Sequence, residues 1–147
     1  MATVNPYLTF NGTCEAAFTF YKSVFGGEIP FMGKFKDMPP QEGCPELSEA
    51  DKEKIMHTSL LISKESVLMG SDSSESSGHK IIPGNNFALS INAGSREEAD
   101  KLFSGLSAGG QITMPMNKAF WGAYFGMFTD KFGIQWMVNF DEAPVPE

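Results

Sequence analysis

One order of elements, a strand, a helix and three further strands, occurs twice in this sequence. This repeat constrains the fold more than any other feature. The first occurrence covers about residues 4–72 and the second about residues 83–140. A unit of this kind is an α+β layer, in which a helix covers the apolar face of a sheet. The repeat therefore predicts two similar α+β modules within one domain of residues 1–147.

The clearest strand pair lies near the C-terminus. Residues 120–129 are apolar and aromatic, and the turn that follows contains Gly133, which can adopt the positive φ that hairpins often need. Residues 134–140 then alternate strictly between apolar and other side chains, as expected of a strand with one buried face. The apolar face carries Ile134, Trp136, Val138 and Phe140, and the opposite face carries Gln135, Met137 and Asn139.

Two amphipathic segments predict the helices. The first covers residues 14–25 and ends at Gly26-Gly27, and the second follows a capping box formed by Ser95 and Glu98. Apolar residues at helical spacing indicate which side of each helix faces the core. The expected core residues are Ala17, Phe20, Tyr21 and Val24 in the first helix, and Ala99, Leu102, Phe103 and Leu106 in the second.

The remaining strands are expected at residues 5–10, 28–35, 55–63, 66–71, 86–91 and 111–116. The match between Asn5-Pro-Tyr-Leu and Asn86-Phe-Ala-Leu places the first strands of the two modules in register. Residues 36–54 form a long polar connection with a short helical turn at 48–54, and such a loop is either functional or mobile. Residues 72–80 are rich in serine and predict a flexible loop.

Composition excludes several classes of protein. The chain has 147 residues, 41 % of them hydrophobic, which is enough for a sizeable core. Its net charge of −7 and the absence of a basic patch argue against nucleic acid or an anionic membrane as a partner. No apolar run approaches the ~20 residues needed to span a bilayer. The first residues do not resemble a signal peptide, and two distant cysteines, which could still pair, fit the reducing cytoplasm.

The strand faces opposite the helices are expected to line a concave interior. They carry Asn5, Tyr7, Thr9, His57, Ser59, Leu61, Val67, Met69, Ser71, Asn86, Ala88, Ser90, Gln135, Met137 and Asn139. This mixture of amide, hydroxyl and thioether groups is typical of ligand pockets. The alternative is that these faces are simply solvated, as antiparallel sheets permit. Met69 and Met137, paired symmetrically on these faces, favour the pocket.

Several motifs resemble the vicinal oxygen chelate superfamily, which includes glyoxalase I, extradiol dioxygenases, and fosfomycin- and bleomycin-resistance proteins. The motifs are Asn5-Pro-Tyr-Leu, Phe25-Gly-Gly-Glu28, Gly70-Ser-Asp72, and Thr129-Asp-Lys-Phe-Gly-Ile-Gln-Trp-Met137, and they are most similar to its PhnB-like branch. The resemblance implies two βαβββ modules that form a curved, partly open, eight-stranded barrel-like sheet with helices outside. It also implies a cytoplasmic homodimer that binds a small molecule.

The superfamily usually holds one divalent metal through His, Gln or Glu on the first and fourth strands of each module. The positions that look equivalent here are Asn5, Met69, Asn86 and Met137. Amides and thioethers are weak ligands for Zn²⁺, Mn²⁺ or Fe²⁺. The resemblance therefore implies a small-molecule-binding protein without the usual metal centre and with no other cofactor. The alternative is a metal-dependent glyoxalase- or dioxygenase-type enzyme whose ligands have moved and could include His57.

The expected pocket-lining residues are Asn5, Tyr7, His57, Met69, Asn86, Trp121 and Met137. His57 is either a structural residue or a base or anion ligand, since its ordinary pKa lies near neutrality. Trp121, with Tyr124 and Phe125, belongs either to packing or to an aromatic wall of the pocket. Asp72 either caps a turn or approaches the pocket, and Cys14, near a helix start, could have a lowered pKa. His79, in the serine-rich loop, is expected at the surface.

Overall fold

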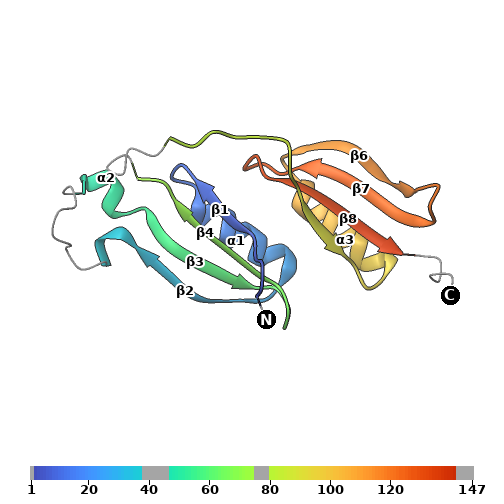
Figure 1. Ribbon diagram of the computed structural model, residues 1–147, viewed down its shortest axis with the longest axis horizontal. Coiled ribbons are helices and arrows are strands. Elements are labelled where there is room, and N and C mark those ends of the chain that lie inside the picture. The colour runs from blue at the N-terminus through green and yellow to red at the C-terminus, as the bar shows by residue number, and fades with distance from the viewer. Residues whose placement is uncertain (1, 38–46, 75–79, 142–147) are drawn as a thin grey trace. The chain divides into compact units, whose positions relative to one another are not determined.

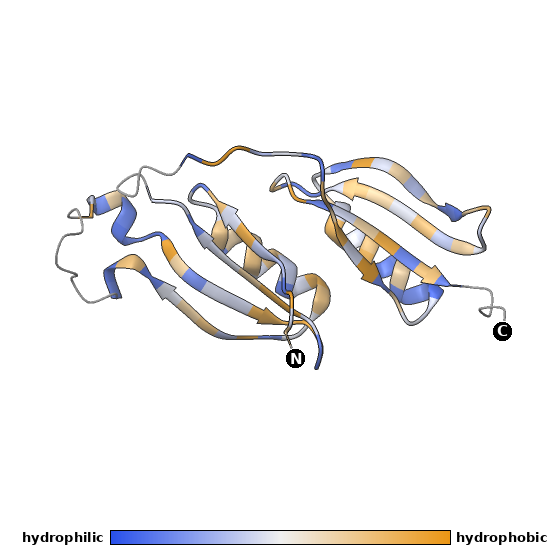
Figure 2. Cartoon of the chain, viewed as in Figure 1, coloured by the Kyte–Doolittle hydropathy of each residue, from blue (hydrophilic) through white to orange (hydrophobic). Residues whose placement is uncertain are grey.

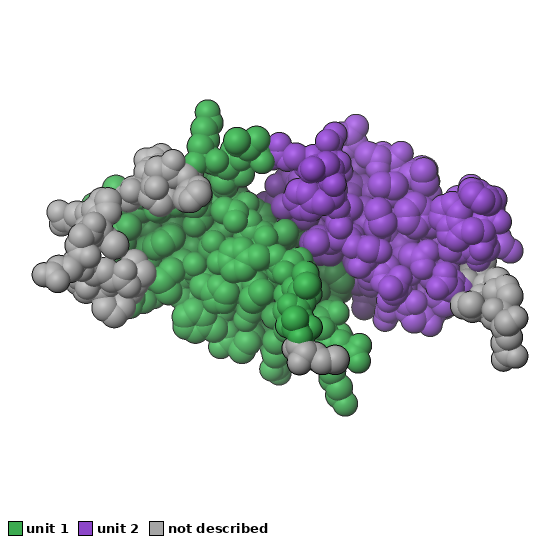
Figure 3. All heavy atoms as spheres, viewed as in Figure 1, with its two compact units in different colours: residues 1–82 green, residues 83–147 purple. Residues whose placement is uncertain are grey.

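The computed structural model describes residues 2–37, 47–74 and 80–141, which fall into two compact units (Figures 1 and 3). Unit 1 comprises residues 1–82 and unit 2 residues 83–147. Each unit contains one strand, one long helix and three further strands, as the repeat predicts. The α+β class is therefore confirmed. In the described part of the chain, no helix combines the length and the apolar character that a bilayer crossing requires.

Unit 1 is a four-stranded sheet with a helix on one face. Its elements are β1 (Tyr7–Phe10), α1 (Cys14–Phe25), β2 (Glu28–Lys34), η1 (Phe35–Asp37), α2 (Glu49–Lys52), β3 (Ile55–Leu61) and β4 (Val67–Asp72). The strand order is β1-β4-β3-β2, with β1 parallel to β4 and the other pairs antiparallel. Of the long connection between β2 and β3, residues 38–46, and with them Cys44, lie outside the described part.

The core of unit 1 lies between α1 and the sheet. Leu8, Leu60 and Leu68 are buried on the helix side of the strands. The prediction for α1 was wrong in part, because the buried stripe is Cys14, Ala17, Phe18 and Tyr21, whereas Phe20 and Val24 are only half-buried. The stripe is rotated toward Phe18 because Gly70 in β4 has no side chain, and the Phe18 ring occupies that space.

Unit 2 repeats this arrangement. Its elements are β5 (Leu89–Asn92), α3 (Arg96–Ser107), β6 (Gln111–Lys118), β7 (Ala123–Thr129) and β8 (Gln135–Asp141), in the order β5-β8-β7-β6. The predicted core of α3 is confirmed at all four positions: Ala99, Leu102, Phe103 and Leu106 are buried. The capping box is also present, since the Glu98 amide donates to Ser95 Oγ at 3.1 Å.

The alternation predicted for the last strand is confirmed, and Figure 2 shows apolar and polar bands along β8. Trp136 and Val138 are 2 % and 0 % exposed on the helix side, so Met137 and Asn139 face the other way. The turn before β8 contains Gly133 with φ 91°, as expected. β7 begins later than predicted, at Ala123, because a tight turn forms in which the Gly122 amide donates to the Ala119 carbonyl at 3.0 Å.

The predicted register of the first strand of unit 2 was wrong. That strand begins at Leu89, three residues after Asn86. Met69 pairs with Tyr7 in unit 1, and Met137 pairs with Ser90 in unit 2. Ser90 therefore takes the place of Tyr7, whereas the match between the two Asn-containing motifs would have put Ala88 there.

Candidate functional site

The sheet of unit 1 leaves one face uncovered by α1, and the strand register brings predicted site residues together on it. A row of directly opposed residues crosses β1, β4, β3 and β2: Tyr7, Met69, Ser59 and Phe31. We call this side the open face of unit 1. Its residues alternate along the strands with the buried core residues, so their side chains point away from α1.

Three rings gather on the open face, with His57 at their centre. The Tyr7 ring stacks on His57, with centroids 5.8 Å apart and planes 28° apart, and the Tyr7 hydroxyl oxygen lies 3.4 Å from His57 Nδ1. The Phe31 ring lies on another side, with its centroid 6.2 Å from that of the imidazole. Tyr7 and Phe31 remain 48 % and 51 % exposed. We call Tyr7, Phe31 and His57 the aromatic cluster.

Gly33 positions the Phe31 ring. Gly33 is the cross-strand partner of His57 in β3, and a Cβ built on Gly33 would lie 2.7 Å from Phe31 Cζ. The ring therefore lies over Gly33, along its own strand, and this brings it beside the imidazole. Phe31 was not among the residues predicted for the site. The signal that could have found it is an aromatic residue two positions before a glycine in a strand.

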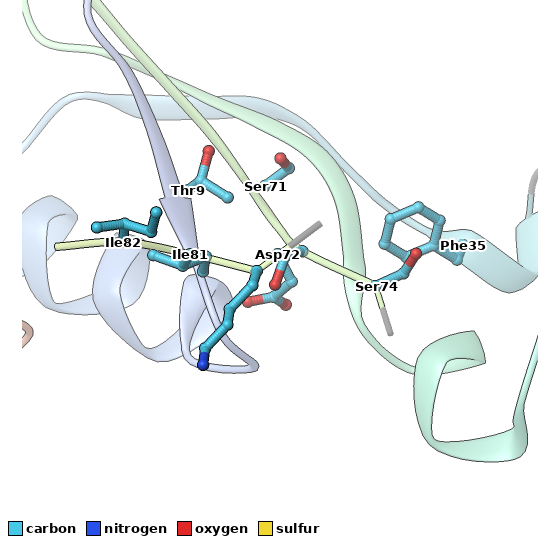
Figure 4. A pocket seen from close by; sticks show the side chains of 9 residues that line it. Thr9, Phe35, Ser71, Asp72, Ser74, Ile81 and Ile82 are labelled. Atoms are coloured by element: carbon cyan, nitrogen blue, oxygen red, sulfur yellow. The ribbon is translucent and has the colours of Figure 1, made fainter. Parts of the chain in front are cut away.

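A cavity of about 510 Å³ lies along the same strands, which is within the usual range for ligand pockets. Thr9 and Ser71 are cross-strand partners, one pleat beyond Tyr7 and Met69, and Figure 4 shows their side chains side by side on one face. The other lining residues combine hydroxyl, amine and apolar groups: Phe35, Asp72, Ser73, Ser74, Lys80, Ile81 and Ile82. Two of the lining residues, Thr9 and Ser71, thus lie on the open face, on the same strands as Tyr7 and Met69.

The Asp72 carboxylate lies on the other side of β4 from the hydroxyls of Thr9 and Ser71 (Figure 4). It is 4 % exposed, and its Oδ1 accepts hydrogen bonds from the amides of Gly12 at 2.9 Å and Cys14 at 3.0 Å. Oδ2 accepts a third, from the Ile55 amide, at 2.9 Å. Of the two roles expected for Asp72, the structure favours the cap, which joins the start of α1 to the start of β3.

Cys14 is not an activated thiol. Burial, helped by the negative charges of Asp72 and Glu15, raises the pKa of the Cys14 thiol to about 12. The expectation of a lowered pKa at the helix start was therefore wrong, because removal from water outweighs the helix dipole.

The raised pKa of Cys14 predicts a loss of stability in alkali. Above the ordinary pKa of 9.0, an unfolded chain loses this proton while the folded chain keeps it. The free energy of unfolding should therefore fall as the pH rises from about 9 toward 12. Urea unfolding at several pH values checks this, and in Cys14→Ala the fall should be smaller. If the free energy of unfolding fell equally with pH in the wild type and in Cys14→Ala, the prediction would be contradicted.

Unit 2 also has an uncovered face, opposite α3, and it is richer in sulfur. A row of directly opposed residues crosses β5, β8, β7 and β6: Ser90, Met137, Met127 and Met114. Asn92, Asn139 and Phe125 form a neighbouring row, in which Asn139 Nδ2 donates to Asn92 Oδ1 at 3.5 Å. Met137 thus lies on the face where the alternation placed it.

Three of the seven predicted pocket residues lie outside the strands. Asn5 is exposed two residues before β1, and Asn86 is exposed before β5. Trp121 is 58 % exposed in the turn between β6 and β7, next to Phe120, which is 98 % exposed. Its ring packs edge-on against Phe125, with centroids 5.9 Å apart. Tyr124 is instead buried on the helix side, where its hydroxyl donates to Asp100 Oδ1 at 2.6 Å.

The side chains that the register pairs on the first and fourth strands of each unit do not suit a divalent metal. Met69 pairs with Tyr7 and Met137 with Ser90, whereas Asn5 and Asn86, the other two positions expected to correspond to metal ligands, lie before their strands. Thioethers, a phenol and an alcohol are poor ligands for Zn²⁺, Mn²⁺ or Fe²⁺, which prefer imidazole, carboxylate or thiolate. Across the ranges that the structure describes, no three His, Cys, Asp or Glu residues come together as a metal-binding group. His79 lies outside those ranges.

Comparison with known proteins gives one family. The family model described as Glyoxalase/Bleomycin resistance protein/Dioxygenase superfamily matches residues 3–138. The protein YjdN of Escherichia coli K12 is 33 % identical over 141 residues, which cover 92 % of this chain and 93 % of YjdN.

Two solved structures extend the comparison. The crystal structure of PA1353 from Pseudomonas aeruginosa has a TM-score of 0.83 and 38 % identity, covering 96 % of this chain and 98 % of that one. A PhnB protein from Bacillus cereus, described as a putative 3-demethylubiquinone-9 3-methyltransferase, has a TM-score of 0.72 and 24 % identity. The match covers 95 % of this chain and 99 % of the Bacillus cereus chain. At this identity, the likeness concerns the fold alone.

Proposed function

Because the chain belongs to the glyoxalase/bleomycin resistance protein/dioxygenase superfamily, we propose that it binds a small, partly apolar molecule on the open face of unit 1. The observation that carries the proposal is the aromatic cluster. The Tyr7 and Phe31 rings contact the His57 imidazole yet remain about half exposed. The Tyr7 hydroxyl, which lies beside His57 Nδ1, adds a polar group to this surface. Exposed rings held in this way offer a planar ligand a stacking surface and a hydrogen bond.

The cavity that Thr9 and Ser71 line extends the proposed site along β1 and β4. Its Thr9 and Ser71 hydroxyls can donate to or accept from polar groups of the same ligand. The ligand class that suits this surface is a flat ring bearing oxygen substituents. Binding or sequestration of such a molecule needs no activated nucleophile.

We also propose that binding proceeds without a conventional divalent metal centre. The support is the thioether, phenol and alcohol groups that the register pairs on the first and fourth strands of each unit. Metal analysis of protein purified without a histidine tag tests this. A stoichiometric divalent ion that is lost in His57→Ala would favour the alternative, a metal-dependent enzyme with relocated ligands.

The assembly proposed for the chain is a homodimer in the reducing cytoplasm. The support for self-association is the exposed aromatic pair Phe120 and Trp121 in unit 2. The support for the compartment is that Cys14, the cysteine within the described residues, is a free thiol. Sedimentation of the wild type and of Phe120→Ser with Trp121→Ser tests the dimer, and unchanged sedimentation of the double variant would place the contact elsewhere.

The binding proposal predicts which simple probes the protein recognises. In an NMR titration, phenol and benzoate should shift the backbone amide signals of Tyr7, Phe31 and His57 saturably, and cyclohexanol, which has no π face, should do so much more weakly. Phe31→Ala and Tyr7→Ala should each weaken phenol binding by about three- to tenfold, since an aromatic contact is worth about 0.5–1.5 kcal/mol.

Phe87→Ala is the matched control for this titration, because Phe87 is 63 % exposed but belongs to unit 2. It should leave phenol binding unchanged. Saturable shifts that survive both unit 1 substitutions, or shifts confined to unit 2, would overturn the proposed site.

A further inference from the structure

The open face of unit 2 carries a ladder of three methionines, one on each of three neighbouring strands. Met137 in β8 is directly opposite Met127 in β7, and Met127 is directly opposite Met114 in β6. Directly opposed residues in a sheet have Cβ atoms only about 4.5–5.5 Å apart. The three flexible thioethers therefore start from adjacent positions, with Met127 in the centre.

A local irregularity of β6 places the third methionine in the ladder. Ile112 is opposite Phe128 on the helix side, so regular pairing would set Thr113 opposite Met127. The register shifts between Ile112 and Met114, and Met114 takes that position instead. Bulges of this kind re-aim side chains and are common beside functional sites. The shift thus adds a thioether to the face where an unshifted strand would present a hydroxyl.

The ladder is accessible. Met114 is 48 % exposed, and Met127 and Met137 are half-buried, so none of the three is locked in the core. Met116, two residues after Met114, differs, because it packs on the helix side against Gly126, where an added Cβ would lie 2.7 Å from the Met116 sulfur. The methionines of unit 2 therefore divide into three on the open face and one beneath the sheet.

From this arrangement we propose that Met114, Met127 and Met137 form a binding site for a soft monovalent cation of the Cu(I) or Ag(I) type. Uncharged thioether sulfur selects such ions and is a poor ligand for Mg²⁺, Ca²⁺ or Zn²⁺. Residues 83–147 contain no histidine and no cysteine, so the soft donors of unit 2 are its four methionine thioethers, and three of them lie on the open face. This site is independent of the ligand proposed for unit 1.

Silver titration of full-length protein labelled with ¹³C at the methionine methyl groups tests the proposal directly. Ag(I) is the probe because it has no accessible second oxidation state under these conditions, and the Cys44→Ser background removes a competing thiol. The methyl signals of Met114, Met127 and Met137 should shift together and saturate at one equivalent. The signals of Met69 and Met116 should remain in place.

Two leucine variants sharpen this test, because leucine preserves size and apolar character without sulfur. Met127→Leu removes the central donor and should abolish the saturable shifts of both Met114 and Met137. Met116→Leu, in the same strand as Met114 but beneath the sheet, should leave the titration unchanged. Independent, non-saturating shifts of single methionines, or coupled shifts that persist in Met127→Leu, would overturn the proposal.

Discussion

Replacing Asp72 by alanine should destabilise unit 1 by about 3 kcal/mol or more. The substitution leaves three backbone amides, those of Gly12, Cys14 and Ile55, without the carboxylate that now accepts from all of them. A hydrogen bond to a charged group contributes about 1.5–3 kcal/mol, and each unsatisfied buried donor adds its own penalty. Urea denaturation followed by circular dichroism measures the loss as a lower transition midpoint.

Asparagine at position 72 separates the geometric from the electrostatic part of this effect. Its amide oxygen can still accept from Gly12 and Cys14, but its NH₂ group faces the Ile55 amide, which needs an acceptor. Asp72→Asn should therefore lie between the wild type and Asp72→Ala. Glu28→Ala, an exposed carboxylate in the same unit, should change stability by less than about 0.5 kcal/mol. If Asp72→Ala were as mild as this control, Asp72 would not be the cap.

Local patterns predicted most of the fold. Strict alternation in residues 134–140 identified Trp136 and Val138 as buried, and the spacing of four apolar residues identified the core side of α3. The same reasoning misplaced the stripe of α1, because Phe18 is buried by a gap in a distant strand, at Gly70. Helical periodicity contains no information about such a gap.

The candidate site was only partly predictable, because its contacts depend on register. Tyr7 and His57 were each expected on the open face, but only the pairing of β1, β4 and β3 brings the two rings together. A short sequence match placed Asn86 in a strand that begins at Leu89. The register shift that turns Met114 onto the open face cannot be seen in the order of apolar and polar residues along β6. The methionine ladder could therefore be recognised only in the structure.

Alanine at Gly70 should destabilise the protein by about 2 kcal/mol, within the range of about 1–3 kcal/mol for overpacked cores. A Cβ there would lie 2.6 Å from Phe18 Cε1 and 2.9 Å from the Leu8 carbonyl oxygen. Neither neighbour can yield easily: Phe18 is 0 % exposed, with edge-on contacts to Phe10 and Tyr21, and the carbonyl belongs to β1. The midpoint of urea denaturation measures this loss.

Gly33→Ala is the matched control, because the same substitution meets a movable neighbour. The new methyl group would lie 2.7 Å from Phe31 Cζ, the far end of a side chain that is 51 % exposed and can rotate into solvent. Although Gly33 is buried, the atoms that cover it belong to this exposed ring, so stability should change by less than about 0.5 kcal/mol. Phenol binding should weaken as it does in Phe31→Ala, because the ring leaves His57. Equal destabilisation by the two alanines would show that the Phe31 ring is fixed in place, and unchanged phenol binding in Gly33→Ala would remove Phe31 from the proposed site.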